Sequence, residues 1–285
     1  MKFKQELVKG LFLFATPLVT SSVFTASPSF AATFAVSESR VNIGNFSHNP
    51  LDISTITDAD TTAISLEDDG QVQADANAEA KFTTDLPTRA YNTSLSTANG
   101  TGNSYFGQAK SLAAVIGYNF IVGSGQTFSF DFKAFLNLDT SIDNPKTERA
   151  NADGQISFEL YDSSDPNPIN WLPLDFFTLS GKLATKKGGD YLYPSNNNYI
   201  TYNPDETYFD TTFGGKKESV NASVTGRYSR TFDSLIKLTL VEAKTNRVSV
   251  KASVQTPESS NLLGLLLFSL LCIGYGIKSK ACELR

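Results

Sequence analysis

Strict alternation of apolar and polar residues is the feature that most constrains how this chain folds. Successive side chains of a β-strand point to opposite faces, so alternation predicts a strand with one buried face. The clearest example is residues 128–138, where the apolar phase consists of Phe128, Phe130, Phe132, Ala134, Leu136 and Leu138. Residues 71–82, 156–160 and 220–228 repeat the period, the first of them largely with alanine. The chain is therefore expected to be built mainly from amphipathic strands.

The remaining segments suggest many short strands joined by turns. Further strands are expected at residues 53–56, 62–66, 112–122 and 174–183, with the first two at a sheet edge. Residues 235–243 and 248–254 predict a closing hairpin across residues 244–247. Residues 85–104, rich in Ser, Thr, Asn and Gly, predict a loop, and Asp153-Gly154 predicts a turn. With no convincing long soluble helix, the expected fold is all-β, an antiparallel β-sandwich with jelly-roll topology.

The N-terminus has the three parts of a secretory signal peptide. Lys2, Lys4 and Lys9 form a positive region, and an apolar run from Leu11 to Val19 follows. Ser29 and Ala31 place small residues at the two positions that a signal peptidase reads. We expect residues 1–31 to be removed after Ala31 and residues 32–256 to form the exported domain. The alternative is a retained N-terminal anchor, for which the run is short and interrupted by Pro17.

The C-terminus predicts a membrane segment. An apolar run at residues 261–277 follows Pro257-Glu258-Ser259 and precedes a basic tail, residues 278–285, which contains Lys278, Lys280 and Arg285. The run is slightly shorter than the roughly 20 residues of a typical transmembrane helix. Basic residues directly after it place the tail in the cytoplasm by the positive-inside rule. A buried C-terminal helix of the globular domain is the alternative, but the run has no polar face.

These last residues, 257–285, resemble the sorting signal of PEP-CTERM proteins, which are processed by an exosortase, in the variant common among cyanobacteria. In that family a Pro-Glu-Pro motif precedes a hydrophobic helix and a short basic end. Here Ser259 stands in place of the second proline. The resemblance implies recognition by a membrane-embedded exosortase and cleavage near the motif. It also implies transient membrane anchoring, then a place at the cell surface or in an extracellular matrix rich in exopolysaccharide. It brings no catalytic residues to this chain.

Composition leaves little material for catalysis. His48 is the only histidine, and both cysteines, Cys272 and Cys282, lie in or after the C-terminal apolar run. Ser-His-Asp or Cys-His catalysis, His/Cys zinc sites and a disulfide-stabilised exported domain are therefore not expected. The net charge of −5 argues against nucleic acid as a partner. The expected role is structural and non-catalytic, and no catalytic residue is assigned.

Two groups of residues nonetheless are candidates for binding. Acidic loops of extracellular β domains can supply the oxygen ligands of calcium, which suggests a cluster of Asp58, Asp60, Glu67, Asp68 and Asp69. Aromatic rings with amide neighbours can stack on sugars, which suggests a glycan site containing Trp171, Tyr191, Tyr193, Tyr199 and Tyr202. The alternatives to a structural protein are thus a carbohydrate-binding module, calcium-stabilised or not, and a glycosidase that uses a pair of carboxylates.

Overall fold

The computed structural model describes residues 32–66, 70–85, 87–186 and 188–253, and these form two antiparallel β-sheets. Only two single-turn 3₁₀ segments, η1 (Pro168–Asn170) and η2 (Pro204–Glu206), interrupt the strands of this part of the chain. The strands are β1 (Ala32–Gly44), β2 (Asp52–Ser65), β3 (Gln71–Thr83), β4 (Arg89–Thr101), β5 (Tyr105–Val122), β6 (Thr127–Ser141), β7 (Glu148–Asp162), β8 (Leu172–Ala184), β9 (Tyr191–Asn196), β10 (Ile200–Tyr202), β11 (Tyr208–Thr212), β12 (Lys217–Thr231) and β13 (Ile236–Ala252).

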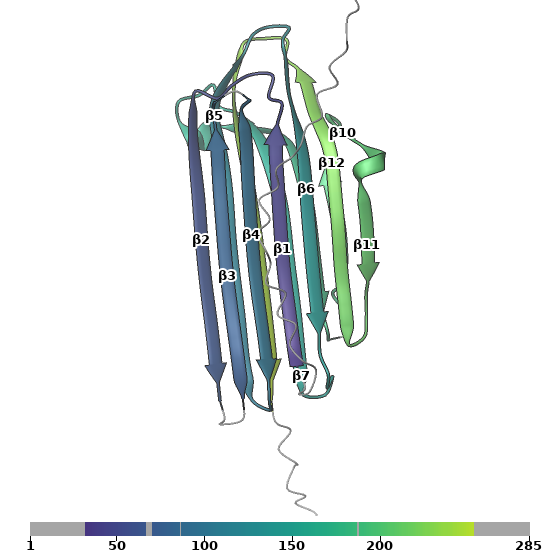
Figure 1. The fold of residues 1–285 in the computed structure, drawn as a ribbon. Coiled ribbons are helices and arrows are strands. Elements are labelled where there is room, and N and C mark those ends of the chain that lie inside the picture. The colour runs from purple at the N-terminus through teal and green to yellow at the C-terminus, as the bar shows by residue number, and fades with distance from the viewer. Residues whose placement is uncertain (1–31, 67–69, 86, 187, 254–285) are drawn as a thin grey trace, which may run out of the picture.

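The two sheets pack face to face as a sandwich (Figure 1). The first sheet has the order β10-β12-β6-β1-β4-β3, with β11 also paired to β12. The second has the order β2-β5-β13-β7-β8-β9. The predicted all-β antiparallel architecture is confirmed. Its strands are longer than expected: β5 has 18 residues, which at about 3.3 Å per residue is roughly 60 Å of extended chain.

The core between the sheets contains a cluster of aromatic rings. Alternate residues of β6 point inward as the sequence predicts, and Phe128, Phe130, Leu136 and Leu138 are fully buried. The ring of Phe130 lies 5.1 Å from that of Tyr228 on the neighbouring strand β12, and 5.3 Å from that of Phe158 on the opposite sheet. Spacings of 4.5–7 Å are typical of favourable aromatic pairs. These contacts hold the two sheets together.

Most of the predicted strands are present. Strands β3, β5, β6, β8 and β12 contain the segments expected for them, and a turn through Gly125, at φ 71°, follows β5. The two short edge strands expected at residues 53–56 and 62–66 are parts of one continuous edge strand, β2. Its side chains are nearly all exposed on both faces. For that reason β2 lacks the alternation of apolar and polar residues from which a strand is predicted.

Three predictions of loops and turns were wrong. The expected loop at residues 85–104 contains β4, the turn at Asp153-Gly154 lies within β7, and the expected hairpin at residues 244–247 is part of the single strand β13. Each segment carries polar or glycine residues at inward positions, which the sequence pattern cannot distinguish from solvent-facing ones.

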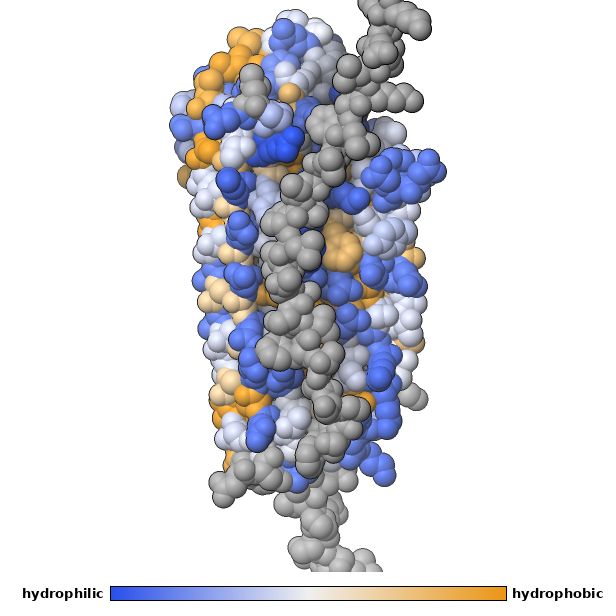
Figure 2. Space-filling model, in the orientation of Figure 1, coloured by the Kyte–Doolittle hydropathy of each residue, from blue (hydrophilic) through white to orange (hydrophobic). Residues whose placement is uncertain are grey.

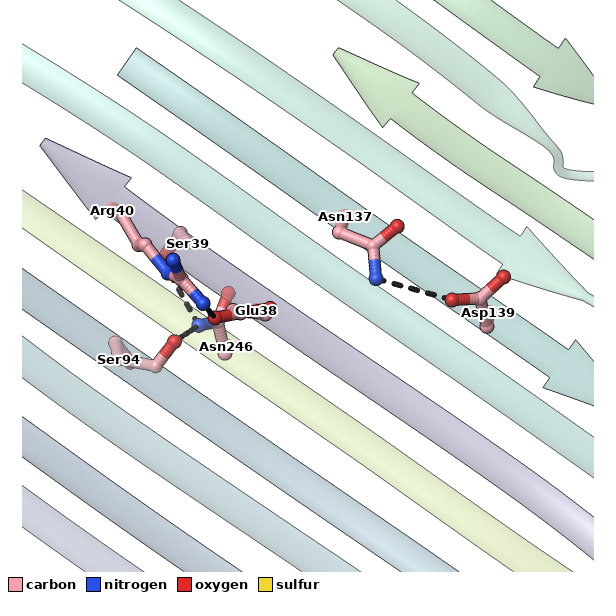
Figure 3. Close-up of polar contacts among 7 residues, drawn as sticks. All are labelled: Glu38, Ser39, Arg40, Ser94, Asn137, Asp139 and Asn246. Atoms are coloured by element: carbon pink, nitrogen blue, oxygen red, sulfur yellow. Dashed lines mark hydrogen bonds and ion pairs between the residues drawn. The ribbon is translucent and has the colours of Figure 1, made fainter. Parts of the chain in front are cut away.

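The buried polar residues of these strands meet in what we call the polar layer, formed by Ser37, Ser39, Asn92, Ser94, Ser96, Ser111, Glu242, Lys244 and Asn246. Asn246 of β13 donates hydrogen bonds across the sandwich to Ser39 Oγ (3.0 Å) and to the main-chain oxygen of Ser94 (2.6 Å), as Figure 3 shows. Its own Oδ1 accepts from Ser37 at 2.9 Å. Buried polar groups are tolerated when they are hydrogen-bonded in this way.

The outer face of the first sheet is largely hydrophilic in the orientation of Figure 2. It carries pairs of polar side chains such as Glu38 with Arg40 on β1, and Asn137 with Asp139 on β6 (Figure 3). Within the described residues, no helix has the length and apolarity that a membrane crossing requires. The signal peptide of residues 1–31, including Ser29 and Ala31, and the sorting signal of residues 257–285 lie outside the described residues.

Candidate functional site

A shallow polar groove of about 440 Å³ lies on the outer face of the second sheet, across β13, β7, β8 and β9. Most of its side chains come from outward positions on neighbouring strands, which alternation places on one face, whereas Asn246 points inward into the polar layer. The lining residues are Asp153, Gly154, Gln155, Ser180, Gly181, Lys182, Tyr191, Thr245, Asn246 and Arg247. The groove is therefore a product of strand register, which aligns Asp153 with Arg247, 94 residues away, and with Lys182, 29 residues away.

Two glycines on adjacent strands form the floor of the groove. Gly154 of β7 pairs with Gly181 of β8. A Cβ atom at Gly154 would lie 2.5 Å from Leu136 Cδ1, and one at Gly181 would lie 3.0 Å from Leu138 Cδ1. Any larger residue at Gly154 would clash with the facing sheet, since real Cβ atoms do not approach other atoms that closely. The missing side chains allow the second sheet to lie close to the first here, which accounts for the depression on its outer face.

The groove carries charges of both signs. Asp153 Oδ1 lies 3.8 Å from Lys182 Nζ, and Arg247 lies on the other side of the same carboxylate. Partial burial raises the pKa of Asp153, and the positive charges of Lys182 and Arg247 partly offset this rise. Asp153 is the one carboxylate among the lining residues. A mixed, solvent-accessible set of donors and acceptors beside an aromatic ring suits a polar, neutral ligand with several hydroxyl groups.

The candidate glycan residues are only partly brought together. Tyr191 and Tyr193 are exposed on β9, and Tyr191 lines the groove. Trp171 lies directly before β8, whereas Tyr191 pairs with Lys182 near the far end of that strand. Eleven strand residues correspond to about 35 Å. The indole of Trp171 instead donates to the main-chain oxygen of Asp165 at 3.0 Å. Trp171 and Tyr191 therefore do not share one site.

The other two tyrosines have contacts within the protein. The guanidinium of Arg230 lies over the ring of Tyr199, 4.7 Å from its centroid, a geometry typical of a cation–π interaction. The hydroxyl of Tyr202 donates to Asn196, which joins β10 to the end of β9. Burial raises the pKa of Tyr202. Tyr202 thus links the end strands β10 and β9 of the two sheets, and Tyr199 packs against β12. These contacts account for the presence of both residues without a ligand.

Of the candidate calcium ligands, the structure describes Asp58 and Asp60. They lie two residues apart on the same face of β2 and are fully exposed. Glu67, Asp68 and Asp69 lie outside the described residues. In the described part of the chain, no group of three or more His, Cys, Asp or Glu side chains is arranged to hold a metal ion. Calcium takes six to eight oxygen ligands, and two exposed carboxylates do not supply that number. Calcium binding by this cluster stays a prediction.

Asp58 and Asp60 have a second physical role that the structure does support. Strand β2 is the end of its sheet, so one side of its backbone has no strand partner within the described part of the chain. An exposed edge of this kind invites pairing with another chain. Charged side chains near the middle of the strand oppose such pairing, because identical strands would bring like charges together.

We expect an Asp58→Asn/Asp60→Asn variant to form more dimers and larger species than the wild type in sedimentation velocity. The matched control is Asp205→Asn/Glu206→Gln, which removes the same charge near η2, away from this edge. Equal association of the two variants would show that net charge alone matters and that β2 does not.

The single histidine, His48, lies in the β1–β2 connection. Its Nδ1 is 2.9 Å from Ser47 Oγ and its Nε2 is 3.2 Å from Gln126 Oε1, so both ring nitrogens contact neutral polar groups. The sorting residues Pro257, Glu258, Ser259, Lys278, Lys280 and Arg285 lie outside the described residues, as the structure describes nothing beyond residue 253. No protein-family model matches this chain, and no curated protein matches it.

Sequence reasoning identified Tyr191 but missed the rest of the groove. Asp153 was assigned to a turn, and Thr245 and Arg247 were assigned to a hairpin loop. The sequence does not indicate Lys182 as a site residue, since a lone lysine on a strand is usually a solvated surface residue. Only the strand register, which joins β13 to β7 and β7 to β8, shows that these residues are neighbours.

Proposed function

We propose that this chain is an exported, non-catalytic protein of the cell surface or extracellular matrix, delivered through an exosortase-type sorting signal. The observation that carries the proposal is the order of features at residues 257–285: Pro257-Glu258-Ser259, an apolar run and a basic tail. The signal-peptide pattern of residues 1–31 is consistent with it, because both ends then direct the domain across a membrane. Signal peptidase and an exosortase are the processing partners of this proposal.

The long sandwich supports a structural role. Most of its strands have 13 to 18 residues, and continuous ladders of main-chain hydrogen bonds run along them. We also retain jelly-roll topology as the finer description of the fold. It is favoured by the repeated crossing of the chain between sheets, as in β4 to β5, β5 to β6 and β6 to β7.

Mass spectrometry of the C-terminal peptide, from protein isolated from its own cells, tests the sorting proposal. We expect the mature chain to end near Pro257–Ser259, because an exosortase would remove the apolar run and the basic tail. The N-terminal peptide of the same sample is expected to begin at Ala32. A chain that still ends at Arg285 would contradict exosortase processing and indicate a single-span membrane protein instead.

A second candidate function is the binding of carbohydrate, such as exopolysaccharide, in the groove. The favouring observation is the exposed ring of Tyr191 beside Asp153, Lys182 and Arg247, since sugars combine flat apolar faces with hydroxyl groups that both donate and accept. Glycosidases use two carboxylates that flank the scissile bond, and the groove lining contributes one. The groove is thus better suited to binding than to hydrolysis.

A Tyr191→Ala variant is expected to lose roughly tenfold in affinity for a bound glycan, about 1.4 kcal/mol, because the stacking surface is removed. Tyr208→Ala is the matched control: it removes a similarly exposed ring, at 49% against 44%, from β11 in the other sheet. Affinity electrophoresis through gels containing exopolysaccharide from the producing cells measures both. Equal retardation of wild type and Tyr191→Ala would exclude the groove as the binding site.

A further inference from the structure

Three residues of the polar layer, Asn92, Glu242 and Lys244, form a connected group between the two sheets. Glu242 and Lys244 point inward from β13 of the second sheet, and Asn92 points inward from β4 of the first. Lys244 Nζ lies 2.8 Å from Glu242 Oε1, and Asn92 Nδ2 donates to Glu242 Oε2. One carboxylate therefore holds an amine and a carboxamide from opposite sheets at the same time.

The group is removed from water. Glu242 and Lys244 are 0% exposed and Asn92 is 1% exposed. Their cross-strand neighbours, which share the same inward face, are apolar: Ala113, Val115, Ile156 and Phe158 around β13, and Val41 and Ala80 around β4. An unpaired charge in such surroundings is costly. For Lys244, burial therefore favours the neutral amine.

Asn92 differs from the other buried asparagine of the layer. Asn246 has partners for both its oxygen and its nitrogen. The Oδ1 of Asn92 is buried and has no hydrogen-bond partner among the residues that the structure describes. Buried unsatisfied oxygens are rare and point to a strained or reactive group. Because the two ends of an amide can exchange places by rotation, this oxygen can also be turned toward the carboxyl group of Glu242.

We propose that Lys244 and Asn92 join in an amide cross-link between the two sheets, formed by the protein itself with Glu242 as the proton-transferring residue. The Nζ of Lys244 attacks Cγ of Asn92, which forms one C–N bond. As this bond forms, the carboxylate of Glu242 takes a proton from Nζ and passes it to Nδ2. The bond between Cγ and Nδ2 breaks and ammonia leaves. Atoms balance, no electron is transferred, and Glu242 is regenerated.

The electrostatics are consistent with this chemistry. Burial lowers the pKa of Lys244 to about 8, even though Glu242 acts in the opposite direction. Neutral amine, the nucleophilic form, is therefore present at a useful fraction near neutral pH. The absence of water protects the product amide from hydrolysis. A covalent link between β4 and β13 suits a protein that functions outside the cell without disulfides.

Intact-mass measurement of the denatured full chain tests the proposal. We expect the wild type to be lighter than its sequence by one ammonia molecule. After trypsin, residues 90–110, which contain Asn92, are expected to be joined to residues 238–247, with the cut after Lys244 missing. Fragmentation should place the branch between Lys244 and Asn92. A chain with the full sequence mass would overturn the proposal. So would a linear 90–110 peptide that has lost ammonia, because Asn99-Gly100 can form a succinimide with the same mass change.

Variants separate the reaction from simple packing. Glu242→Gln keeps the shape of the side chain but cannot transfer the proton, and we expect it to retain the full mass. Ser111→Ala is the matched control: it removes another buried polar group of the layer, which contacts Ser94 and Ser96, and should still lose ammonia. If Glu242→Gln does not fold, Lys244→Met removes the nucleophile and gives the same expectation. Loss of ammonia in either variant would exclude the assigned roles.

Discussion

A Phe130→Ala variant is expected to lose about 3–5 kcal/mol of unfolding free energy, the range for truncating a buried phenylalanine. Phe130 is 0% exposed, and its ring contacts those of Phe46, Phe128, Phe158 and Tyr228 at centroid distances of 5.1–5.9 Å. Removal of the ring leaves a cavity at the centre of the cluster, on a strand with partners on both sides. Its neighbours are themselves held by strand register and can fill the space only partly. The loss is therefore expected near the upper end of the range.

Urea unfolding followed by tryptophan fluorescence measures this change, since Trp171 is the single tryptophan. The control is Phe209→Ala on β11, where the ring is 45% exposed and a change within about 0.5 kcal/mol is expected. Equal m-values in the two variants would show that the difference lies in the native state. Similar losses in both variants would contradict the central position assigned to Phe130.

The comparison of β6 with β13 shows what the sequence can and cannot predict. In β6 every inward residue from Phe128 to Leu138 is apolar, so a local window is sufficient to define the strand and its buried face. In β13 the inward positions include Glu242, Lys244 and Asn246. The partners of Glu242 and Asn246, which are Asn92, Ser94 and Ser39, lie 150 to 207 residues away in the chain. No local pattern indicates that a polar residue will find a buried partner at that separation.

The same reason explains the outcome for the candidate site. The sequence alone indicates an aromatic cluster at the exposed tyrosines of β9, because aromatic residues can be recognised without knowledge of their neighbours in space. Asp153, Lys182 and Arg247 become a group only through the pairing of β13, β7 and β8. Gly154 was interpreted as a turn residue, whereas it is needed for the close approach of the two sheets at Leu136. Glycine is suited both to a turn and to the close approach of two sheets, and the sequence does not distinguish these two roles.

The second large effect is expected for Asp175→Ala, which should cost about 3 kcal/mol or more of unfolding free energy. Asp175 is buried on β8, and its Oδ2 accepts hydrogen bonds from Tyr228 Oη (2.5 Å) and Arg230 Nη1 (2.9 Å), both on β12 of the other sheet. Its Oδ1 accepts one from Asn197. Without the carboxylate, the fully buried hydroxyl of Tyr228 loses its acceptor.

Two further variants determine which part of this contact matters. Asp175→Asn keeps an acceptor for Tyr228 but removes the charge opposite Arg230, which is 24% exposed and can be hydrated. We therefore expect Asp175→Asn to lose only about half as much as Asp175→Ala. Asp210→Ala, an exposed aspartate on β11, controls for the loss of one carboxylate and should change stability by less than about 0.5 kcal/mol. Thermal unfolding of the three variants gives the order of their stabilities. If Asp175→Asn lost as much unfolding free energy as Asp175→Ala, the ion pair with Arg230 would be the main stabilising contact between β8 and β12. The hydrogen bond from Tyr228 would then be the lesser one.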